Sequence, residues 1–329
     1  MSAALHERAL LQRLAAGPAS GDALAREAGL TRAAVWKRIE ALRQAGIGIV
    51  AEAGRGYRLA HPLDLLEPEA IRAALPAAVQ ARLAGLEVAW TLESSNSELL
   101  RRTPPAQGCA VLLAERQTGG RGRRGRSWAS PLAANLYLSL ARCFDGGLAR
   151  LGGLSLAMGV ASVEALHALG AVQVRLKWPN DLVVIEAGGL RKLGGLLIEG
   201  GGEVAGSARA VVGLGLNVRM PPAYAAGIDQ PWADLAGLLP VPPARNTLAT
   251  VLLAHLLPAL DVFEAQGLPA FLPRYAALDA LAGRNLRIET PAGHWQAQAL
   301  GLADDGALRV RDAQGVLRHV HAGDVSVRP

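Results

Sequence analysis

Cysteine is scarce in this sequence, and long apolar runs are absent from it. Only Cys109 and Cys143 occur among 329 residues, and they form no Cys-x-x-Cys pair. A disulfide framework or a cysteine-based zinc site is therefore not expected. No run of 18 or more apolar residues is present, and residues 1–17 carry charges where a signal peptide needs an uninterrupted apolar stretch. We expect a cytoplasmic protein that does not associate with a membrane.

Lysine is also scarce, although the chain is basic. Only three of the 34 basic residues are lysines, namely Lys37, Lys177 and Lys192. Since arginine supplies nearly all other positive charge, each lysine suggests a position that needs a compact ammonium instead of a planar guanidinium. The formal net charge is +6, and residues 1–60 hold nine basic and five acidic residues, a surplus of four. This distribution favours an anionic partner for the N-terminal part of the chain.

The hydrophobic pattern divides the chain into three segments, which its length and 51% hydrophobic content allow. Residues 1–62 have the pattern of three short helices and a hairpin, and residues 61–68 form a junction. Residues 63–282 combine strands at 109–115, 135–140, 182–185, 193–199 and 210–218 with long helices at 151–169 and 247–266. No regular strand–helix–strand spacing is present, so we predict an α/β (α+β) fold with a mixed sheet. Residues 283–329 alternate short strands with turns, which predicts a small all-β domain.

A helix-turn-helix is the favoured interpretation of the first segment. Ser20 can cap a helix at residues 21–28, and Thr31 can cap a second one with Val35, Ile39 and Leu42 as its buried stripe. This second helix is basic near its start, and a hairpin with a Gly-Arg-Gly tip follows, which is the layout of a recognition helix and a wing. We expect DNA contacts from Thr31, Arg32, Ala33, Trp36, Lys37 and Arg55. A helical bundle with a solvated charged face is the alternative.

The stretch GGRGRRGRSW, residues 119–128, places four arginines among four glycines, and we call it the arginine loop. Gly120, Gly122 and Gly125 formally match a dinucleotide-binding fingerprint, but Pro131 and an alternating strand follow where that motif needs a helix. A P-loop is excluded because no Gly-Lys-Ser/Thr ending is present. Glycines permit close backbone approach, so successive N–H groups and about two arginines could wrap a phosphate. We expect the loop to be mobile until an anion binds; a nucleic-acid patch is the alternative.

Three further motifs follow the arginine loop, and their residue types also suit a binding site. KWPNDL at 177–182 combines a cation, an indole, a turn and a carboxylate, and Lys192 lies at the start of the next strand. GLGLN at 213–217 is a second glycine cluster. Each motif has a purely structural explanation: Trp178 as core, Pro179 and Asn180 as a turn, and Lys192 as a solvated residue of an edge strand. In combination with the arginine loop they indicate a functional site on loops of a rigid sheet.

Taken in order, ERQTGGRGRRGRSW, KWPNDL, LRKLGGLLIE and GLGLN resemble the bacterial biotin protein ligases of the bifunctional type, which also repress biotin-synthesis genes. The resemblance extends over essentially the whole chain, including GRGY at the wing. It implies a winged-helix DNA-binding domain at 1–62, a catalytic domain at 63–282 and an SH3-like β-barrel domain at 283–329. It also implies that biotin is activated by ATP with Mg²⁺ to biotinyl-5′-adenylate and transferred to a lysine of a biotin carboxyl carrier domain, such as that of acetyl-CoA carboxylase. Operator DNA and a homodimer, formed when the adenylate is bound, are the other implied partners.

The resemblance also assigns site residues. For biotin it implies Ser94, Ser95, Asn96, Gln117, Gly120, Arg121, Gly122, Arg123, Trp128 and Lys192. For the nucleotide it implies Arg123, Arg124, Trp128, Asn135, Asn180, Asn217 and Trp232. Catalysis is implied for Lys192, Arg121, Arg123, Asp181 and Lys177, with Asp181 either an Mg²⁺ ligand or the acceptor of the carrier lysine's proton.

Two positions depart from the pattern of this family. Ser95 stands where the family has threonine, although it keeps a hydroxyl. Trp36 stands where a smaller polar residue is usual, and this indole would change the base contacts. One alternative is a ligase whose winged helix no longer binds an operator. A regulator that binds an acyl-nucleotide without ligating it is disfavoured because Lys177, Asp181 and Lys192 are all present, and a lipoate-protein ligase of the same fold is not expected to carry GRGRRGR with KWPND.

Overall fold

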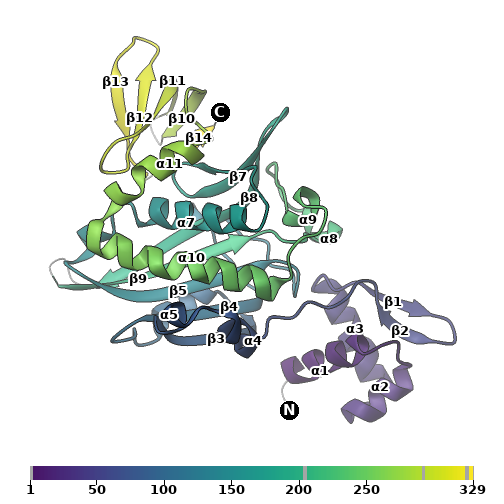
Figure 1. Ribbon diagram of the computed structural model, residues 1–329. Coiled ribbons are helices and arrows are strands. Elements are labelled where there is room, and N and C mark those ends of the chain that lie inside the picture. Colours follow the sequence, from purple (N-terminus) through teal and green to yellow (C-terminus); the bar gives the residue numbers. More distant parts are fainter. Residues whose placement is uncertain (1–2, 203–205, 291–292, 323–325, 329) are drawn as a thin grey trace.

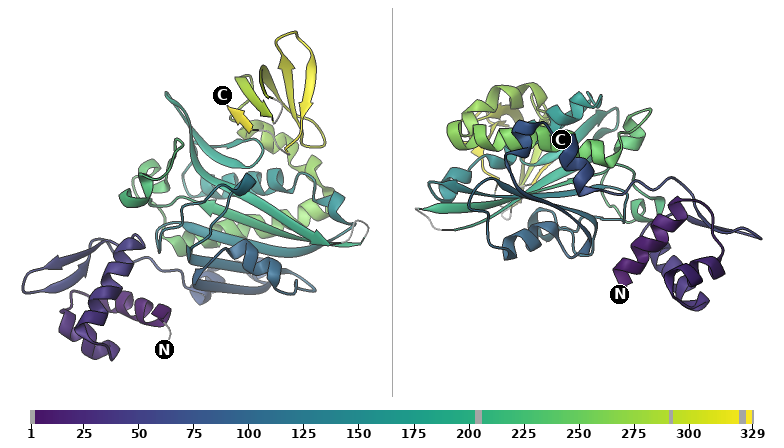
Figure 2. Two further views of the ribbon diagram at one scale, coloured as in Figure 1. Left: turned by 180° about the vertical axis from the view of Figure 1, so that it is seen from behind. Right: turned by 60° about the horizontal axis from the view of Figure 1, so that its bottom comes forward.

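The computed structural model describes residues 3–202, 206–290, 293–322 and 326–328 (Figure 1). A small helical domain at the N-terminus lies to one side of a larger body that is built on a seven-stranded sheet. A separate five-stranded sheet at the C-terminus packs at another side of this body. The three segments thus form spatially distinct parts, and the views in Figure 2 agree on this arrangement.

The N-terminal domain has the winged-helix layout that the sequence predicts. It contains α1 (Ala3–Ala15), α2 (Gly21–Ala28), α3 (Arg32–Gln44) and the antiparallel hairpin of β1 (Ile49–Glu52) and β2 (Gly56–Leu59). Both predicted caps are confirmed: Ser20 accepts a hydrogen bond from the Ala23 N–H at 3.1 Å, and Thr31 accepts one from the Ala34 N–H at 3.2 Å. Val35, Ile39 and Leu42 are buried, so the exposed face of α3 carries the residues that we expect to contact DNA.

The central sheet is mixed, as predicted. Its strands lie in the order β3-β4-β5-β9-β8-β7-β6, and only β3 and β4 run parallel. Their bounds are β3 Leu83–Leu92, β4 Cys109–Gln117, β5 Leu136–Asp145, β6 Val174–Lys177, β7 Asp181–Glu186, β8 Gly189–Gly202 and β9 Ser207–Leu216. The sequence pattern does not predict β3 or β6. Both are edge strands, and β3 keeps most of its residues partly exposed, so neither presents a fully apolar run.

Helices cover both faces of the central sheet (Figure 2). The long helices α7 (Leu154–Ala168) and α10 (Arg245–Gln266) pack in the main core on one face, and α6 (Ser95–Arg101) lies on the other. Two helical stretches, Leu148–Ala168 and Arg245–Gln266, are long and apolar enough to cross a membrane by length and composition alone. In this fold their apolar side chains supply much of the core between helices and sheet, which explains their composition.

Short helices complete the central part, and a C-terminal sheet follows. The short helices are α4 Pro68–Ala74, α5 Ala77–Gln80, α8 Pro222–Ala225, α9 Leu235–Leu238 and α11 Leu272–Leu278. The C-terminal strands are β10 Asn285–Thr290, β11 Gly293–Leu302, β12 Leu308–Asp312, β13 Leu317–Val320 and β14 Ser326–Arg328. They form one antiparallel sheet in the order β13-β12-β11-β10-β14, an open sheet compatible with the SH3-like domain that the resemblance implies. The Trp178 indole N–H donates to the Gly306 carbonyl at 3.0 Å, which joins this sheet to the central part.

The N-terminal domain shares part of its core with the central part. Leu132, which follows the arginine loop, is 2% exposed and packs in the hydrophobic core of the winged helix. Its N–H donates to the Ala45 carbonyl at 2.8 Å, directly after α3. Nearby, the Tyr224 hydroxyl on α8 donates to the Gln44 carbonyl at 3.2 Å. The loop at Leu132 and the short helix α8 therefore abut the C-terminal end of α3.

A buried ion pair stabilises the start of the central part. Arg245 at the beginning of α10 lies 2.8 Å from a Glu115 carboxylate oxygen on β4, and both side chains are 2% exposed. The other Glu115 oxygen accepts a hydrogen bond from the Leu66 N–H at 2.6 Å, and Arg245 also donates to the Asp64 carbonyl at 2.7 Å. The segment that leaves the N-terminal domain is thus fixed to both β4 and α10.

Candidate active site

The arginine loop leaves β4 and forms a compact turn. The Gly122 N–H donates to the Arg126 carbonyl at 2.7 Å, and the Trp128 N–H donates to the Gly120 carbonyl at 2.9 Å. Between these bonds, residues 123–125 make one turn of 3₁₀ helix, in which Arg124 (φ 58°) and Gly125 (φ 69°) adopt left-handed backbone conformations. These bonds bring Trp128 back beside the first glycines of the loop.

Lys192 and Asp181 lie beside Trp128 and form what we call the cationic cluster. It combines the KWPNDL and LRKLGGLLIE motifs. The Lys192 Nζ on β8 is 2.6 Å from an Asp181 carboxylate oxygen at the start of β7, and both side chains are about one-fifth exposed (20% and 19%). The same ammonium lies 5.5 Å from the centre of the Trp128 ring. Gly195 leaves room for this arrangement, because a Cβ there would lie 3.3 Å from Lys192 Nζ. Lys192 is therefore a half-buried cation with a fixed partner, unlike a solvated edge lysine.

Arg123 extends the cluster toward the C-terminal sheet. Its guanidinium donates to the Asn180 side-chain oxygen at 3.3 Å and to the Ala322 carbonyl. Burial lowers the pKa of Arg123 from its ordinary value, while the nearby Asp181 carboxylate acts in the opposite direction. Asn180 is held in turn by donating to the Leu196 carbonyl at 2.7 Å. The turn of KWPNDL thus presents Asn180 and Asp181 to the two cations.

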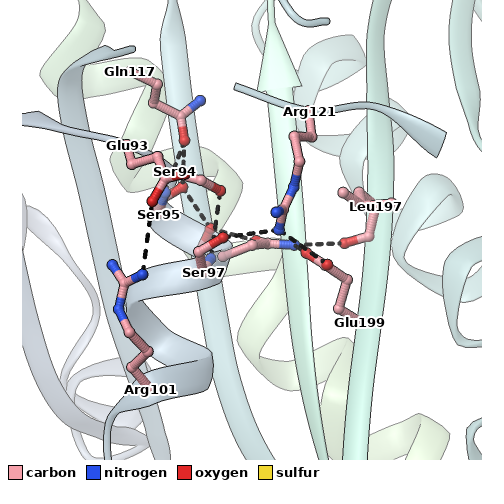
Figure 3. Close-up of polar contacts among 11 residues, drawn as sticks. Glu93, Ser94, Ser95, Ser97, Arg101, Gln117, Arg121, Leu197 and Glu199 are labelled. Carbon is pink, nitrogen blue, oxygen red and sulfur yellow. Dashed lines mark hydrogen bonds and ion pairs between the residues drawn. The ribbon is translucent and has the colours of Figure 1, made fainter. Parts of the chain in front are cut away.

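Polar side chains at the start of α6 form a second cluster (Figure 3). Ser94, Ser95 and Asn96 are each 4% exposed, and Ser94 caps the helix by accepting from the Ser97 N–H. Gln117, at the end of β4, accepts hydrogen bonds from the Ser95 N–H at 2.8 Å and from the Ser95 hydroxyl at 3.1 Å. The predicted ring-binding residues are therefore together, at the base of the arginine loop.

Arg121 belongs to this polar cluster and not to the cationic one. Its guanidinium donates to the Ser97 hydroxyl at 2.8 Å and to a Glu199 carboxylate oxygen at 3.2 Å (Figure 3). Ser97 and Glu199 are not predicted from the sequence, and neither is the buried Ser139 of β5, which lies 2.6 Å from the Asn96 side-chain oxygen. Glu199 ends the LRKLGGLLIE motif, which is the one signal that could have drawn attention to it.

Three residues that are expected near the nucleotide form hydrogen bonds or backbone contacts within the protein, namely Asn135, Asn217 and Trp232. Asn135 is fully buried and accepts a hydrogen bond from the Val218 N–H at 2.9 Å, and Asn217 donates to the Ala233 carbonyl at 3.0 Å. Trp232 lies beside the cationic cluster, because its backbone forms a bridge with Lys192. Lys177, at the end of edge strand β6, is partly exposed, and Arg124 is exposed. No group of three His, Cys, Asp or Glu side chains suited to a metal ion occurs in the described part of the chain.

Comparisons with known proteins agree with this arrangement of domains and loops. Family models for an HTH domain, for the biotin/lipoate A/B protein ligase family and for the biotin protein ligase C-terminal domain match residues 6–58, 89–217 and 282–328. The bifunctional ligase/repressor BirA of Escherichia coli (strain K12) is 36% identical over 311 residues, which cover 94% of this chain and 92% of that protein. The chain belongs to the family of bifunctional biotin protein ligases and repressors. This membership explains why one chain carries both a winged helix and a site with a polar and a cationic end.

Other members of the biotin protein ligase family show the same relation. The biotin--[acetyl-CoA-carboxylase] ligase of Mycobacterium tuberculosis is 35% identical over 249 residues, covering 73% of this chain and 88% of that protein. Among solved structures, a biotin protein ligase from Aquifex aeolicus in complex with biotin and ATP superposes with a TM-score of 0.62. It is 23% identical, and the match covers 74% of this chain and 99% of that one, so it supports the fold.

Proposed function

We propose that this chain joins biotin to a lysine of a biotin carboxyl carrier domain and represses biotin-synthesis genes. The ligase proposal rests on the site itself, which has the polar cluster at one end and the cationic cluster at the other. Biotin has a neutral ureido ring at one end and a carboxylate at the other. The ring suits the hydrogen-bonding groups of Ser94, Ser95 and Gln117, and the carboxylate suits Lys192 and Arg123. The curated relatives named as ligases or ligase/repressors support the same conclusion.

The reaction would have two steps. A carboxylate oxygen of biotin attacks the α-phosphorus of MgATP, which forms biotinyl-5′-adenylate and releases pyrophosphate. The amine of the carrier lysine then attacks the acyl carbon, and AMP leaves. Both steps concentrate negative charge at phosphate oxygens or beside them, so catalysis depends mainly on positioning and electrostatic stabilisation.

The residues of the cationic cluster suit these steps. Lys192 can neutralise the biotin carboxylate during attack and the bridging oxygen afterwards, since an ammonium adapts to both geometries better than a guanidinium fork. Asp181, already 2.6 Å from Lys192 Nζ, holds that cation in place and is the nearest carboxylate to receive the carrier lysine's proton. Mg²⁺ enters with ATP, bound mainly to its phosphates, and Asp181 is the carboxylate of the cluster that could share it. Trp128 and Trp232 would supply flat apolar surfaces beside the acyl chain and the adenine.

Glycine at position 213 is required by the polar cluster. A Cβ there would lie 2.4 Å from the Asn96 side-chain oxygen, which is held by its own hydrogen bonds. Gly213→Ala is therefore expected to displace Asn96 and raise the KM for biotin by about tenfold, the usual scale of an overpacked buried site. Steady-state kinetics of biotin-dependent pyrophosphate exchange measure this. Gly201→Ala is the matched control, because nothing lies within 4 Å of a Cβ at that position; equal KM values for the two variants would contradict the prediction.

The ligase proposal is tested by incubating the protein with biotin, MgATP and a carrier domain. Mass spectrometry should find one biotinylated lysine on the carrier, with AMP and pyrophosphate released. A parallel reaction with lipoate tests the related lipoate-ligase alternative. Modification by lipoate without modification by biotin would reject the proposal.

The repressor proposal rests on the exposed face of α3 and on the wing. Arg32, Trp36 and Lys37 are exposed on α3, with Trp36 55% exposed, and Arg55 is exposed at the hairpin tip. These side chains can reach phosphates and base edges of a major groove once the helix enters it. We infer that biotinyl-adenylate promotes a homodimer that binds a palindromic operator. We also infer a cytoplasmic location without membrane association, since the two apolar helices are occupied in the core.

Lys37 is expected to contribute a phosphate contact. Lys37→Ala should weaken operator binding and reduce the slope of log K against log salt by about one. Gel-shift titrations at several salt concentrations, with biotin and ATP present, measure this slope on DNA from upstream of biotin-synthesis genes. A variant with an unchanged slope would show that Lys37 lies away from the DNA. A wild-type protein that does not bind this DNA at low salt would leave only the ligase proposal.

A further inference from the structure

A continuous series of hydrogen bonds connects Gln117, just before the arginine loop, with Arg121 inside it. Gln117, before the loop, contacts Ser95, whose hydroxyl lies 2.7 Å from that of Ser139. Ser139 contacts the Asn96 side-chain oxygen at 2.6 Å, and the Asn96 amide nitrogen donates to a Glu199 oxygen at 2.9 Å. The other Glu199 oxygen accepts from Arg121, inside the loop. This series of hydrogen bonds starts at Gln117, runs through side chains on α6, β5 and β8, and ends at Arg121. Figure 3 shows Gln117, Arg121 and Glu199 around the start of α6.

Glu199 has a central position in this chain of contacts. Its two carboxylate oxygens accept from two different elements, Asn96 on α6 and Arg121 in the loop. Its side chain is 28% exposed, and that of Arg121 is 42% exposed. Asn96 also donates to the Leu197 carbonyl at 3.1 Å, so both of its amide hydrogens are engaged and its oxygen must face Ser139. The carboxylate therefore fixes the orientation of Asn96 as well as the position of Arg121.

The same contacts determine what Arg121 can do. Its charge is already opposed by Glu199, and its guanidinium is also bound to Ser97 at 2.8 Å. An arginine held in this way anchors the loop instead of serving as a mobile ligand for a carboxylate or a phosphate. Arg123, beside Asn180 and Asp181, then remains for the anionic end of the substrate.

We propose that Glu199 is a positioning residue, which latches the start of the arginine loop onto α6 through Arg121 and Asn96. The latch lets the polar cluster at the start of α6 and the arginine loop form as one unit, so recognition of the ureido ring depends on it while the adenylation chemistry does not. This proposal rests on the proposed ligase function for its ligand, but the latch itself is a property of the free protein. Linked hydrogen bonds reinforce one another where they are buried, as they are at Ser95, Asn96 and Ser139.

The first experiment compares Glu199→Gln with Glu164→Gln in the full chain. Glu164 forms a surface ion pair with Arg274 whose exposures, 30% and 42%, match those of Glu199 and Arg121, and it lies outside the site. Glu199→Gln is expected to raise the KM for biotin about tenfold with kcat within about twofold, because a charged hydrogen-bonded acceptor is lost at a partly exposed position. Glu164→Gln should match the wild type. An unchanged KM for Glu199→Gln would overturn the proposal, and a lowered KM would show that Glu199 competes for Arg121 instead of positioning it.

Two further measurements separate the latch from simple destabilisation and from the ligase proposal. Arg121→Gln should resemble Glu199→Gln, and the double variant should be no worse than the more affected single variant, since both remove one interaction. Additive losses would overturn the proposal. Amide hydrogen exchange of residues 119–123 in the ligand-free protein should be about tenfold faster in Glu199→Gln than in Glu164→Gln. Equal exchange would overturn the latch even if biotin were not the substrate, whereas failure of biotinylation by the wild type affects the ligase proposal alone.

Discussion

Lys192→Ala is expected to lower kcat/KM for biotin adenylation by about 10²- to 10³-fold, the scale seen when a preorganised charge-stabilising group is removed from an active site. The ammonium lies 2.6 Å from an Asp181 oxygen and 5.5 Å from the centre of the Trp128 ring. Its removal leaves the Asp181 carboxylate without its partner where two more anions must approach. The substitution therefore both withdraws a positive charge and exposes a negative one.

Biotin-dependent exchange of pyrophosphate into ATP measures this step without the carrier. Lys192→Arg is expected to be strongly impaired as well, because a planar fork cannot occupy the space that Gly195 leaves for an ammonium. Arg274→Ala, which removes a cation from a surface ion pair on α11, serves as the control. A Lys192→Ala protein within tenfold of this control would show that catalysis does not depend on the ammonium.

Arg245→Met is expected to lower the free energy of unfolding of the central part by about 3–5 kcal/mol, because it leaves a buried carboxylate without its counter-ion. Glu115 and Arg245 are both 2% exposed and 2.8 Å apart. Loss of the guanidinium also removes the hydrogen bond to the Asp64 carbonyl. The segment at residues 64–66 would keep its other hydrogen bonds, from the Arg245 N–H to the Asp64 carboxylate and from the Leu66 N–H to Glu115, but lose this one.

Urea denaturation of the full chain, followed by a signal from the central part, measures this loss. Arg274→Met removes an exposed partner and is expected to cost less than about 1 kcal/mol. Replacing Glu115 by leucine in the Arg245→Met background should restore part of the stability, since it removes the buried charge. If Arg245→Met and Arg274→Met were equally stable, the buried pair would not hold the segment in place.

Local signals in the sequence were sufficient for much of the fold. Ser20 and Thr31 cap the helices that they were expected to cap, and the apolar period of α3 places its basic face outward. The apolar runs of β4, β5, β7, β8 and β9 were found because these strands are largely buried. Strands β3 and β6 were missed because an edge strand is hydrogen-bonded on one side only and needs no continuous apolar run.

The site was predicted unevenly, for a physical reason. Lys192 and Asp181 lie in motifs on paired strands, so short-range order along the chain brings them together. Glu199 and Ser139 depend on how β8, β9 and β5 are registered and on where α6 packs, which no local pattern encodes. Arg121 illustrates the difference: its place in the loop was evident from the sequence, but its partner is 78 residues away.

Leu132 makes the winged helix an incomplete module when it is taken alone. A fragment that ended after the wing would lack this side chain and leave a hole in a core that buries it to 2% exposure. It would also lose the hydrogen bond to the Ala45 carbonyl at the end of α3. A chimaera that exchanges the DNA-reading domain between relatives must therefore bring along a compatible residue at position 132. The two activities of this chain share a piece of structure, and a cut or graft at the linker divides that piece.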